Sequence, residues 1–324
     1  MGKIDQSVKA YVKIPGIFTQ LFNETFFDRE HYIHPEDVSE QDSVTDVPLK
    51  GREMAERIRD VCMLSKSGMG FRIILGVEEQ TDIHYYMPVR VMQLDAMHYE
   101  KQCRMKAADA RQQGIQFPPV HGVPRGTVIC PVMTVVLYVG EDRWDGPREL
   151  YDMYGLKEEE KKWLKQYVPN YPMHLIDARH MSEKELSRFT GDLKIFFTAM
   201  REDCNEEMMK GMVAKYPDTW YTLAVVKNDK RYSSYARTVT GSKDEENGGG
   251  IAVDKWLDKV EERGFRRGIS QGISQGLSQG IDMITELYKR MASEGRQEDI
   301  KRSFEDAVYQ RGLLQEYGLT EEGV

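Results

Sequence analysis

The stretch "RIILGVEEQTD", residues 72–82, decides the fold class that the sequence predicts. It begins with a nearly continuous apolar run and ends on two carboxylates and an amide, Glu78, Glu79 and Gln80. An apolar run without alternation is typical of a strand that is buried on both faces in the middle of a sheet. We therefore expect a central strand. Its acidic end is either an ordinary solvated strand end or places a carboxylate in a catalytic site.

A second extended run precedes this strand. It is "AERIRDVCML", residues 55–64, and the turn-rich "SKSGMG" follows it, so the two runs predict a β-hairpin. Asp60 falls inside the first strand and Glu78 closes the second. If the strands pair, the two carboxylates approach each other at one end of the sheet.

Two converging carboxylates and a backbone carbonyl are the oxygen ligands that a hard cation such as Mg²⁺ prefers. A metal ion held there would polarise a phosphate oxygen and lower the pKa of an attacking water molecule. Gln80 lies two residues beyond Glu78 and so faces the same side of the strand, where its amide could orient the water or the phosphate. On spacing alone, ordinary solvated strand ends explain this pattern better than a metal site does.

The other elements indicate a mixed α/β core. Apolar spacing predicts an amphipathic helix from Pro15 and a long helix from Met87 to about Gln113. Strands are expected within residues 127–140, buried on both faces, and within residues 173–179, whereas the polar stretch 34–51 is expected to be a loop. Ser182 and Glu185 have the spacing of a capping box, so a helical region is expected to begin there. We divide the chain into a first domain, residues 1–200, and a helical C-terminal region, residues 201–324.

An internal repeat marks the C-terminal region. The tract at about residues 264–281 contains "RGISQGISQGLSQG", in which glycines recur every four residues. Each glycine costs a helix about 1 kcal/mol relative to alanine. The tract is therefore either a marginal helix held by packing against a partner or a flexible connector, and we favour a tether or a self-association helix that forms a homo-oligomer.

The composition is that of a soluble globular protein, with 40% hydrophobic and 30% charged residues in a chain of 324. No apolar run is long enough to span a membrane, and the first residues lack a signal-peptide core, so we expect a cytoplasmic protein that does not contact a membrane. The four cysteines are far apart, which argues against a zinc knuckle and a disulfide framework. The net charge of −8 argues against a protein that simply coats nucleic acid, although a local basic face remains compatible with it.

Several stretches resemble the bacterial PD-(D/E)XK nuclease-family putative transposases, relatives of the Rpn recombination-promoting nucleases. They are "FTQLFNETFFD", "IHPEDVSEQD", "RIRDVCML", "ILGVEEQTDIHYYMPVRVMQLDAMHY" and "VMTVVLYVGEDRWDGPRELYDM". The resemblance covers roughly residues 8–200, and a tail of short glycine-containing repeats is also a habit of this group. It implies a restriction-endonuclease-like core, with a central mixed sheet flanked by helices, and metal-dependent cleavage of DNA.

The resemblance also assigns roles to the carboxylates. Asp60 matches the first acid of the motif, Glu78 the second acid, and Gln80 the place of its lysine. Asp60, Glu78 and the backbone carbonyl of Glu79 would then bind Mg²⁺, with Mn²⁺ as a substitute. The side chain of Glu79 is expected to point the other way, as an ordinary solvated acid.

Two further residues are implied more loosely. Glu24, on the first predicted helix, matches the region where many nucleases of this fold supply an acid that contacts the metal through water. Arg90, on the helix after the motif, is a candidate for contacting DNA phosphate, and a surface arginine is an equally good interpretation.

The sequence thus predicts a Mg²⁺-dependent DNA endonuclease that hydrolyses phosphodiester bonds, with a link to recombination or mobile elements. The alternative is a catalytically weak DNA-binding or self-associating protein on the same fold. The acidic balance of the chain favours the alternative slightly, whereas the Asp60, Glu78 and Gln80 trio favours the enzyme.

Overall fold

The computed structural model divides into two compact units, Met1–Val260 and Glu261–Val324, which are described separately below. It describes residues 2–27, 32–41, 44–45, 57–58, 60–66, 72–117, 122–240 and 249–319.

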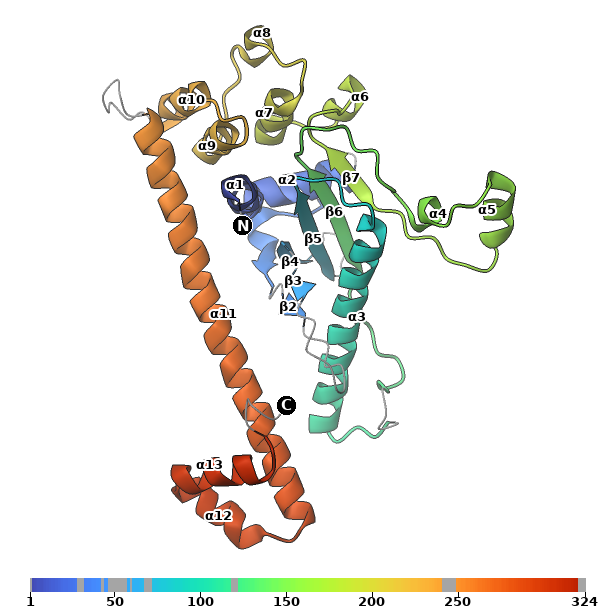
Figure 1. Ribbon diagram of the computed structural model, residues 1–324, viewed down its shortest axis with the longest axis vertical. Coiled ribbons are helices and arrows are strands. Elements are labelled where there is room, and N and C mark those ends of the chain that lie inside the picture. The colour runs from blue at the N-terminus through green and yellow to red at the C-terminus, as the bar shows by residue number, and fades with distance from the viewer. Residues whose placement is uncertain are drawn as a thin grey trace. The chain divides into compact units, whose positions relative to one another are not determined.

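The first unit is built on a five-stranded mixed sheet with the order β1-β4-β5-β6-β7 (Figure 1). Its strands are β1 (Val38–Glu40), β4 (Val61–Lys66), β5 (Arg72–Gln80), β6 (Val132–Tyr138) and β7 (His174–Asp177). The pairs β1–β4 and β4–β5 are antiparallel, whereas β5, β6 and β7 run parallel. A separate two-stranded sheet pairs β2 (Val44–Thr45) with β3 (Arg57–Ile58). The predicted α/β class with a central mixed sheet is confirmed.

The predicted hairpin is present as the antiparallel pair β4–β5, with Val61 opposite Val77. Asp60 lies one residue before β4, at a bend, and not inside the strand as the sequence suggested. Residues 67–71, which include most of the predicted turn, lie outside the described residues. The prediction of a loop at residues 34–51 was wrong for β1, for β2 and for the 3₁₀ turn η1 (Pro35–Asp37), and residues 42–43 and 46–51 lie outside the described residues. A three-residue edge strand is too short to show an alternating pattern, and edge strands are often short and polar.

One face of the sheet is covered by α1 (Lys3–Val12) and α2 (Pro15–Phe26). Aromatic residues of α2, among them Phe18 and Phe22, share one buried cluster with alternate residues of β5, such as Leu75 and Val77. Helix α2 begins with proline in its first turn, as the sequence predicted.

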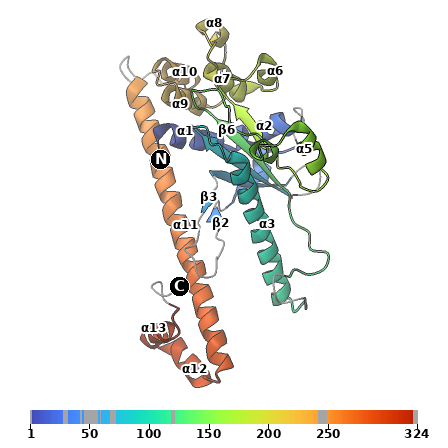
Figure 2. The same ribbon diagram turned by 45° about the vertical axis from the view of Figure 1, so that its right-hand side comes forward.

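The other face is covered by the long helix α3 (Met87–Gln112), which lies along the sheet in both views (Figures 1 and 2). Its first turns place Met87 and Val91 against Val136 and Tyr138 of β6. Because Val135 and its alternate neighbours of β6 lie in the cluster on the opposite face, β6 is buried on both sides, as predicted.

The segment between β6 and β7 carries two short helices, α4 (Leu150–Met153) and α5 (Glu158–Leu164). After β7, Ser182 and Glu185 form the predicted capping box at the start of α6 (Glu183–Leu186). The helix does not continue: α7 (Gly191–Met200) starts anew at Gly191, whose φ of 44° lies in the left-handed region that glycine tolerates.

Helices beyond residue 200 belong to the same unit. They are α8 (Glu206–Met209), α9 (Pro217–Val226) and α10 (Arg231–Thr240). Trp220 and Leu223 of α9 are buried in the cluster that contains α1 and α2, and α9 packs directly on α1. The start of α11 (Gly249–Ser293) adds Trp256, whose indole N–H donates to Asp218 at 2.9 Å. The first compact unit, Met1–Val260, therefore includes helices from the part of the chain that the sequence analysis describes as the helical C-terminal region.

The second unit contains the rest of α11 together with α12 (Gln297–Glu305) and α13 (Ala307–Glu316). Leu287 and Met291 of α11 pack with Leu313 of α13 in a small apolar cluster. The glycine repeat lies within α11 and is helical. No helix in the described ranges is both long enough and apolar enough to cross a membrane.

Candidate functional site

The candidate site lies where β5 ends and β4 begins. The register of Val61 opposite Val77 brings Asp60 to the end of β5. There Oδ2 of Asp60 accepts a hydrogen bond of 2.9 Å from the backbone N–H of Glu79. Since β5, β6 and β7 are parallel, this edge also holds the carboxyl ends of the parallel strands, which is where ligands bind in open α/β sheets. The structure thus brings Asp60 to the strand end that carries Glu78 and Gln80, as predicted.

Glu78 faces α3 and is completely buried. Both Nε and Nη2 of Arg90, in the first turn of α3, donate to its Oε2 at 3.2 Å. An ionised carboxylate without a compensating charge is very unfavourable in such a place. Arg90 therefore compensates the buried charge of Glu78 in this structure, and its own side chain remains 30% exposed.

Asp60 has a cation of its own. Nζ of Lys9, on α1, lies 2.8 Å from Oδ1 of Asp60 and 2.7 Å from Oδ1 of Asp5. Burial alone would lower the pKa of Lys9, but the charges and hydrogen bonds of the two aspartates raise it. The three side chains are mostly buried, so this pairing ties α1 to the end of the sheet.

Glu79 lies on the opposite side of β5 from Glu78, as the pleat requires, but it is not the solvated acid that the sequence suggested. It is only 6% exposed because α1 covers it. Burial and a hydrogen bond with Asp5 raise its pKa to about 9, with a further contribution from the charge of Asp5. A pKa of about 9 favours the protonated form of Glu79 near neutral pH, in which its hydroxyl would donate to Asp5.

Gln80, the last residue of β5, lies opposite Tyr138 of β6 and is half-buried. Its backbone oxygen accepts a hydrogen bond of 2.9 Å from Val139. Because side chains alternate along a strand, its amide is on the same side as Glu78. The role of this amide beside the second acid stays a prediction.

Glu24 lies elsewhere in the contact network. Its side chain is buried, and both carboxylate oxygens accept the backbone N–H of Thr190 at 3.1 and 3.2 Å. The hydroxyl of Thr190 and the amide of Gln20 also donate to Oε1. Thr190 precedes α7, so Glu24 holds the start of that helix, where a negative charge is favourable. These contacts do not join Glu24 to Asp60 or Glu78.

The donor chemistry at the strand ends fits a hard divalent cation, with two carboxylates and a backbone carbonyl at one sheet edge. Within the ranges that the structure describes, no group of three or more Asp, Glu, His or Cys side chains is already arranged around a common metal position. Instead, each of the two predicted acids is paired with a basic side chain, Asp60 with Lys9 and Glu78 with Arg90. A metal ion would therefore take over charge compensation that these cations now provide.

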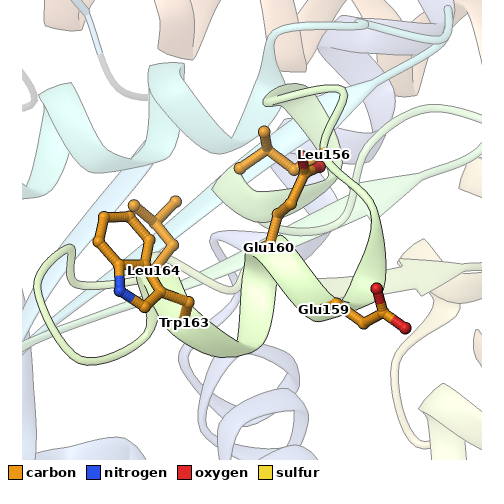
Figure 3. A pocket seen from close by; sticks show the side chains of 5 residues that line it. All are labelled: Leu156, Glu159, Glu160, Trp163 and Leu164. Carbon is orange, nitrogen blue, oxygen red and sulfur yellow. The ribbon is translucent and has the colours of Figure 1, made fainter.

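Two hollows elsewhere in the first unit contain none of the predicted site residues. The larger, about 540 Å³, is lined by Leu156 and by Glu159, Glu160, Trp163 and Leu164 of α5 (Figure 3). The other, about 280 Å³, is lined by residues from Cys204 to Tyr235 around α8 and α10. Neither hollow is lined by Asp60, Glu78 or Glu79.

The sequence interpretation missed the contribution of α1, and with it Asp5 and Lys9. A signal was available, since Ile4, Val8 and Tyr11 recur at helical spacing, but no N-terminal helix was inferred. The N-cap residue is Gly2, which has no side chain that could cap the helix. The sequence therefore lacks the capping signature that would have indicated where the helix starts.

Comparison with known proteins supports the resemblance for part of the chain. Residues 121–228 match the family model described as putative transposase, YhgA-like, a family of the PD-(D/E)XK and Rpn type. The matched segment runs from before β6 to the end of α9 and does not include Asp60 or Glu78. No curated protein and no solved structure matches the chain.

Proposed function

We propose that this protein is a metal-dependent endonuclease of the PD-(D/E)XK type that hydrolyses phosphodiester bonds in DNA. The observation that carries the proposal is the placement of Asp60 at the end of β5, where it accepts a hydrogen bond from the backbone of Glu79, the residue after Glu78, at the carboxyl ends of the parallel strands. The match of residues 121–228 to YhgA-like putative transposases supports a role on DNA that is related to mobile elements or recombination.

In this proposal, Asp60, Glu78 and the backbone carbonyl of Glu79 hold Mg²⁺, for which Mn²⁺ is a substitute. When bound, the ion would polarise a phosphate oxygen and lower the pKa of a water molecule. Gln80 orients the water or the phosphate through its amide, since it lies on the same side of β5 as Glu78. Gln80 carries no charge, so the positive charge beside the phosphate comes from Arg90 in this proposal.

The resemblance also implies that Glu24 contacts the metal through water, and this proposal does not depend on that role. Its contacts with Thr190 give it a structural task already. We therefore assign the metal to the residues at the ends of β4 and β5 and leave Glu24 to a direct test, described in the Discussion.

The test is plasmid nicking with Mg²⁺ or Mn²⁺ by the wild-type protein and by two variants. Asp60→Asn keeps the size of the side chain and removes its charge, and we expect it to abolish nicking. Asp82→Asn is the control, because Asp82 is an exposed acid in the turn directly after β5. Loss of nicking in Asp60→Asn with activity retained in Asp82→Asn supports the proposal. Equal activity in all three proteins, or no nicking by the wild type, contradicts it.

A second candidate function is a catalytically weak DNA-binding or self-associating protein on the same fold. The specific observation in its favour is that Asp60 and Glu78 are both already paired with basic side chains. This candidate predicts that the wild type and Asp60→Asn bind duplex DNA equally in EDTA and that neither nicks it with a metal ion. The nicking assay and a gel-shift assay together separate the two candidates.

A further inference from the structure

The pairing of Glu78 with Arg90 has a geometry that suggests a replaceable cation. Both guanidinium nitrogens donate to the same carboxylate oxygen, Oε2, and both distances are 3.2 Å. A tight arginine–carboxylate pair uses both oxygens in parallel, with distances of about 2.7–2.9 Å. The Lys9–Asp60 contact at the same sheet end has that shorter distance, 2.8 Å. Arg90 therefore holds Glu78 less closely than Lys9 holds Asp60.

We propose that Arg90 and a divalent cation compete for Glu78, so that Arg90 neutralises this carboxylate in the metal-free protein and is released from it when the metal binds. This inference rests on the proposed function, because it takes Glu78 as a metal ligand. It adds a residue that controls metal loading and that becomes free for a phosphate group in the same step.

Glu78 and Arg90 are buried to different extents, and this difference indicates that Arg90 is the partner that moves when a metal ion binds. Glu78 is inaccessible to solvent, so its charge requires a cation close by. Arg90 is 30% exposed, so its guanidinium can turn toward water at little cost. The segment before it ends in two exposed tyrosines, Tyr85 and Tyr86, so the released guanidinium would stand on an accessible surface where DNA could approach.

Linkage makes the competition measurable without any cleavage. If Arg90 and the metal exclude each other at Glu78, the metal must displace Arg90 in the wild type. Removing the arginine must then tighten metal binding by the free energy of the Arg90–Glu78 pairing. The variant also loses the charge that compensates Glu78, so its stability should depend on the metal. A structural arginine that does not compete would give the loss of stability but no change in metal affinity.

The experiment uses the full chain and Mn²⁺ or Mg²⁺ as the probe. Binding is measured by titration calorimetry, and thermal unfolding is followed with and without the ion. We expect Arg90→Met to bind Mn²⁺ about tenfold more tightly than the wild type, and its melting temperature to rise more with the ion. The matched control is Arg104→Met on the same helix, since Arg104 pairs with exposed Glu100, and it should behave as the wild type.

Each outcome decides the question. Equal Mn²⁺ affinity for the wild type and Arg90→Met, with nicking by the wild type intact, overturns the inference and leaves the proposed function standing. No metal binding by either protein overturns the proposed function as well. If Arg90→Met is unfolded without metal, refolding on addition of Mn²⁺ supports the competition and failure to refold overturns it. Arg90→Lys, which retains the charge, should keep an affinity close to that of the wild type.

Discussion

The ammonium group of Lys9 lies 2.8 Å from Oδ1 of Asp60 and thereby joins the N-terminal helix to the end of the central hairpin. Both side chains are mostly buried, so dissolved salt weakens the attraction between them less than it would weaken a surface pair. The same ammonium holds Asp5, one turn away on α1. Lys9 therefore holds two neighbouring acids, Asp5 and Asp60, in place.

We predict that Lys9→Met destabilises the protein by about 1–3 kcal/mol, because two mostly buried carboxylates lose their cation. Lys13→Met is the matched control, since Lys13 on the following turn pairs with the more exposed Glu40, and we expect a change below about 1 kcal/mol. Urea unfolding followed by circular dichroism measures both. Equal free energies of unfolding for the two variants would show that the Lys9 cluster does not hold α1.

Stability should also respond to the protonation of Glu79. Burial and the hydrogen bond with Asp5 raise the pKa of Glu79 from its ordinary value of 4.5 to about 9. Between these values the folded protein holds a proton that the unfolded chain has released, so the free energy of unfolding must fall as the pH rises. The contribution of this one group is at most about 1.4 kcal/mol per pH unit.

Replacing the acid by an amide removes this dependence. We predict that Glu79→Gln is more stable than the wild type near pH 8. We also predict that its free energy of unfolding changes less between pH 5 and pH 9, the interval between the ordinary and the raised pKa of Glu79. Glu100→Gln, at an exposed acid on α3, should keep the wild-type pH profile. Chemical denaturation across this pH range provides the test, and parallel profiles for Glu79→Gln and the wild type would contradict the buried, protonated state.

The central part of the fold was predictable from local patterns. The apolar run of β5, the lack of alternation in β6 and the periodicity of α3 each reflect burial by the sheet itself, and each was confirmed. Edge elements carry weaker signals, because β1 is three residues long and mostly exposed. The helix α1 was missed even though its apolar spacing is regular, since it starts without a capping side chain.

The candidate site was predictable in position but not in charge balance. Strand alternation correctly separates Glu78 from Glu79, but alternation cannot show whether a helix covers the second face. Glu79 is buried because α1 lies over it, and that helix lies 67–76 positions away in the sequence. The partners Lys9 and Arg90 likewise come from two different helices, so no local motif could have paired them with Asp60 and Glu78.

The role of Glu24 can be tested apart from the rest of the site. Its carboxylate is buried and accepts hydrogen bonds from Thr190 and Gln20, so Glu24→Ala leaves several donors unsatisfied. We predict a loss of about 2–3 kcal/mol in the free energy of unfolding, together with an unchanged affinity for Mn²⁺. Weaker Mn²⁺ binding by the folded variant would instead support the water-mediated metal contact that the family resemblance implies.

The glycine repeat offers a test of self-association that leaves the single chain undisturbed. Apart from the backbone of its own helix and its chain neighbours, a Cβ atom at Gly276 or at Gly280 would meet no atom of the described residues within 4 Å. Leucine should therefore fit at both positions in an isolated chain, and it should strengthen the helix by about 1 kcal/mol per site. If the repeat packs against a second copy, the leucines must collide with that copy, because the close approach of two helices depends on small residues.

We predict that the wild-type protein has a mass above that of one chain in light scattering after size-exclusion chromatography, and that Gly276→Leu/Gly280→Leu reduces it. Gly312→Leu is the control, since Gly312 in α13 also has open space around it but lies outside the repeat. A wild-type mass of a single chain, or an unchanged mass in the double variant, would assign the repeat to the role of a tether. The two interpretations thus differ in the mass measured by light scattering. In a tether, leucine strengthens the helix and leaves that mass unchanged, whereas in a self-association helix it lowers the mass.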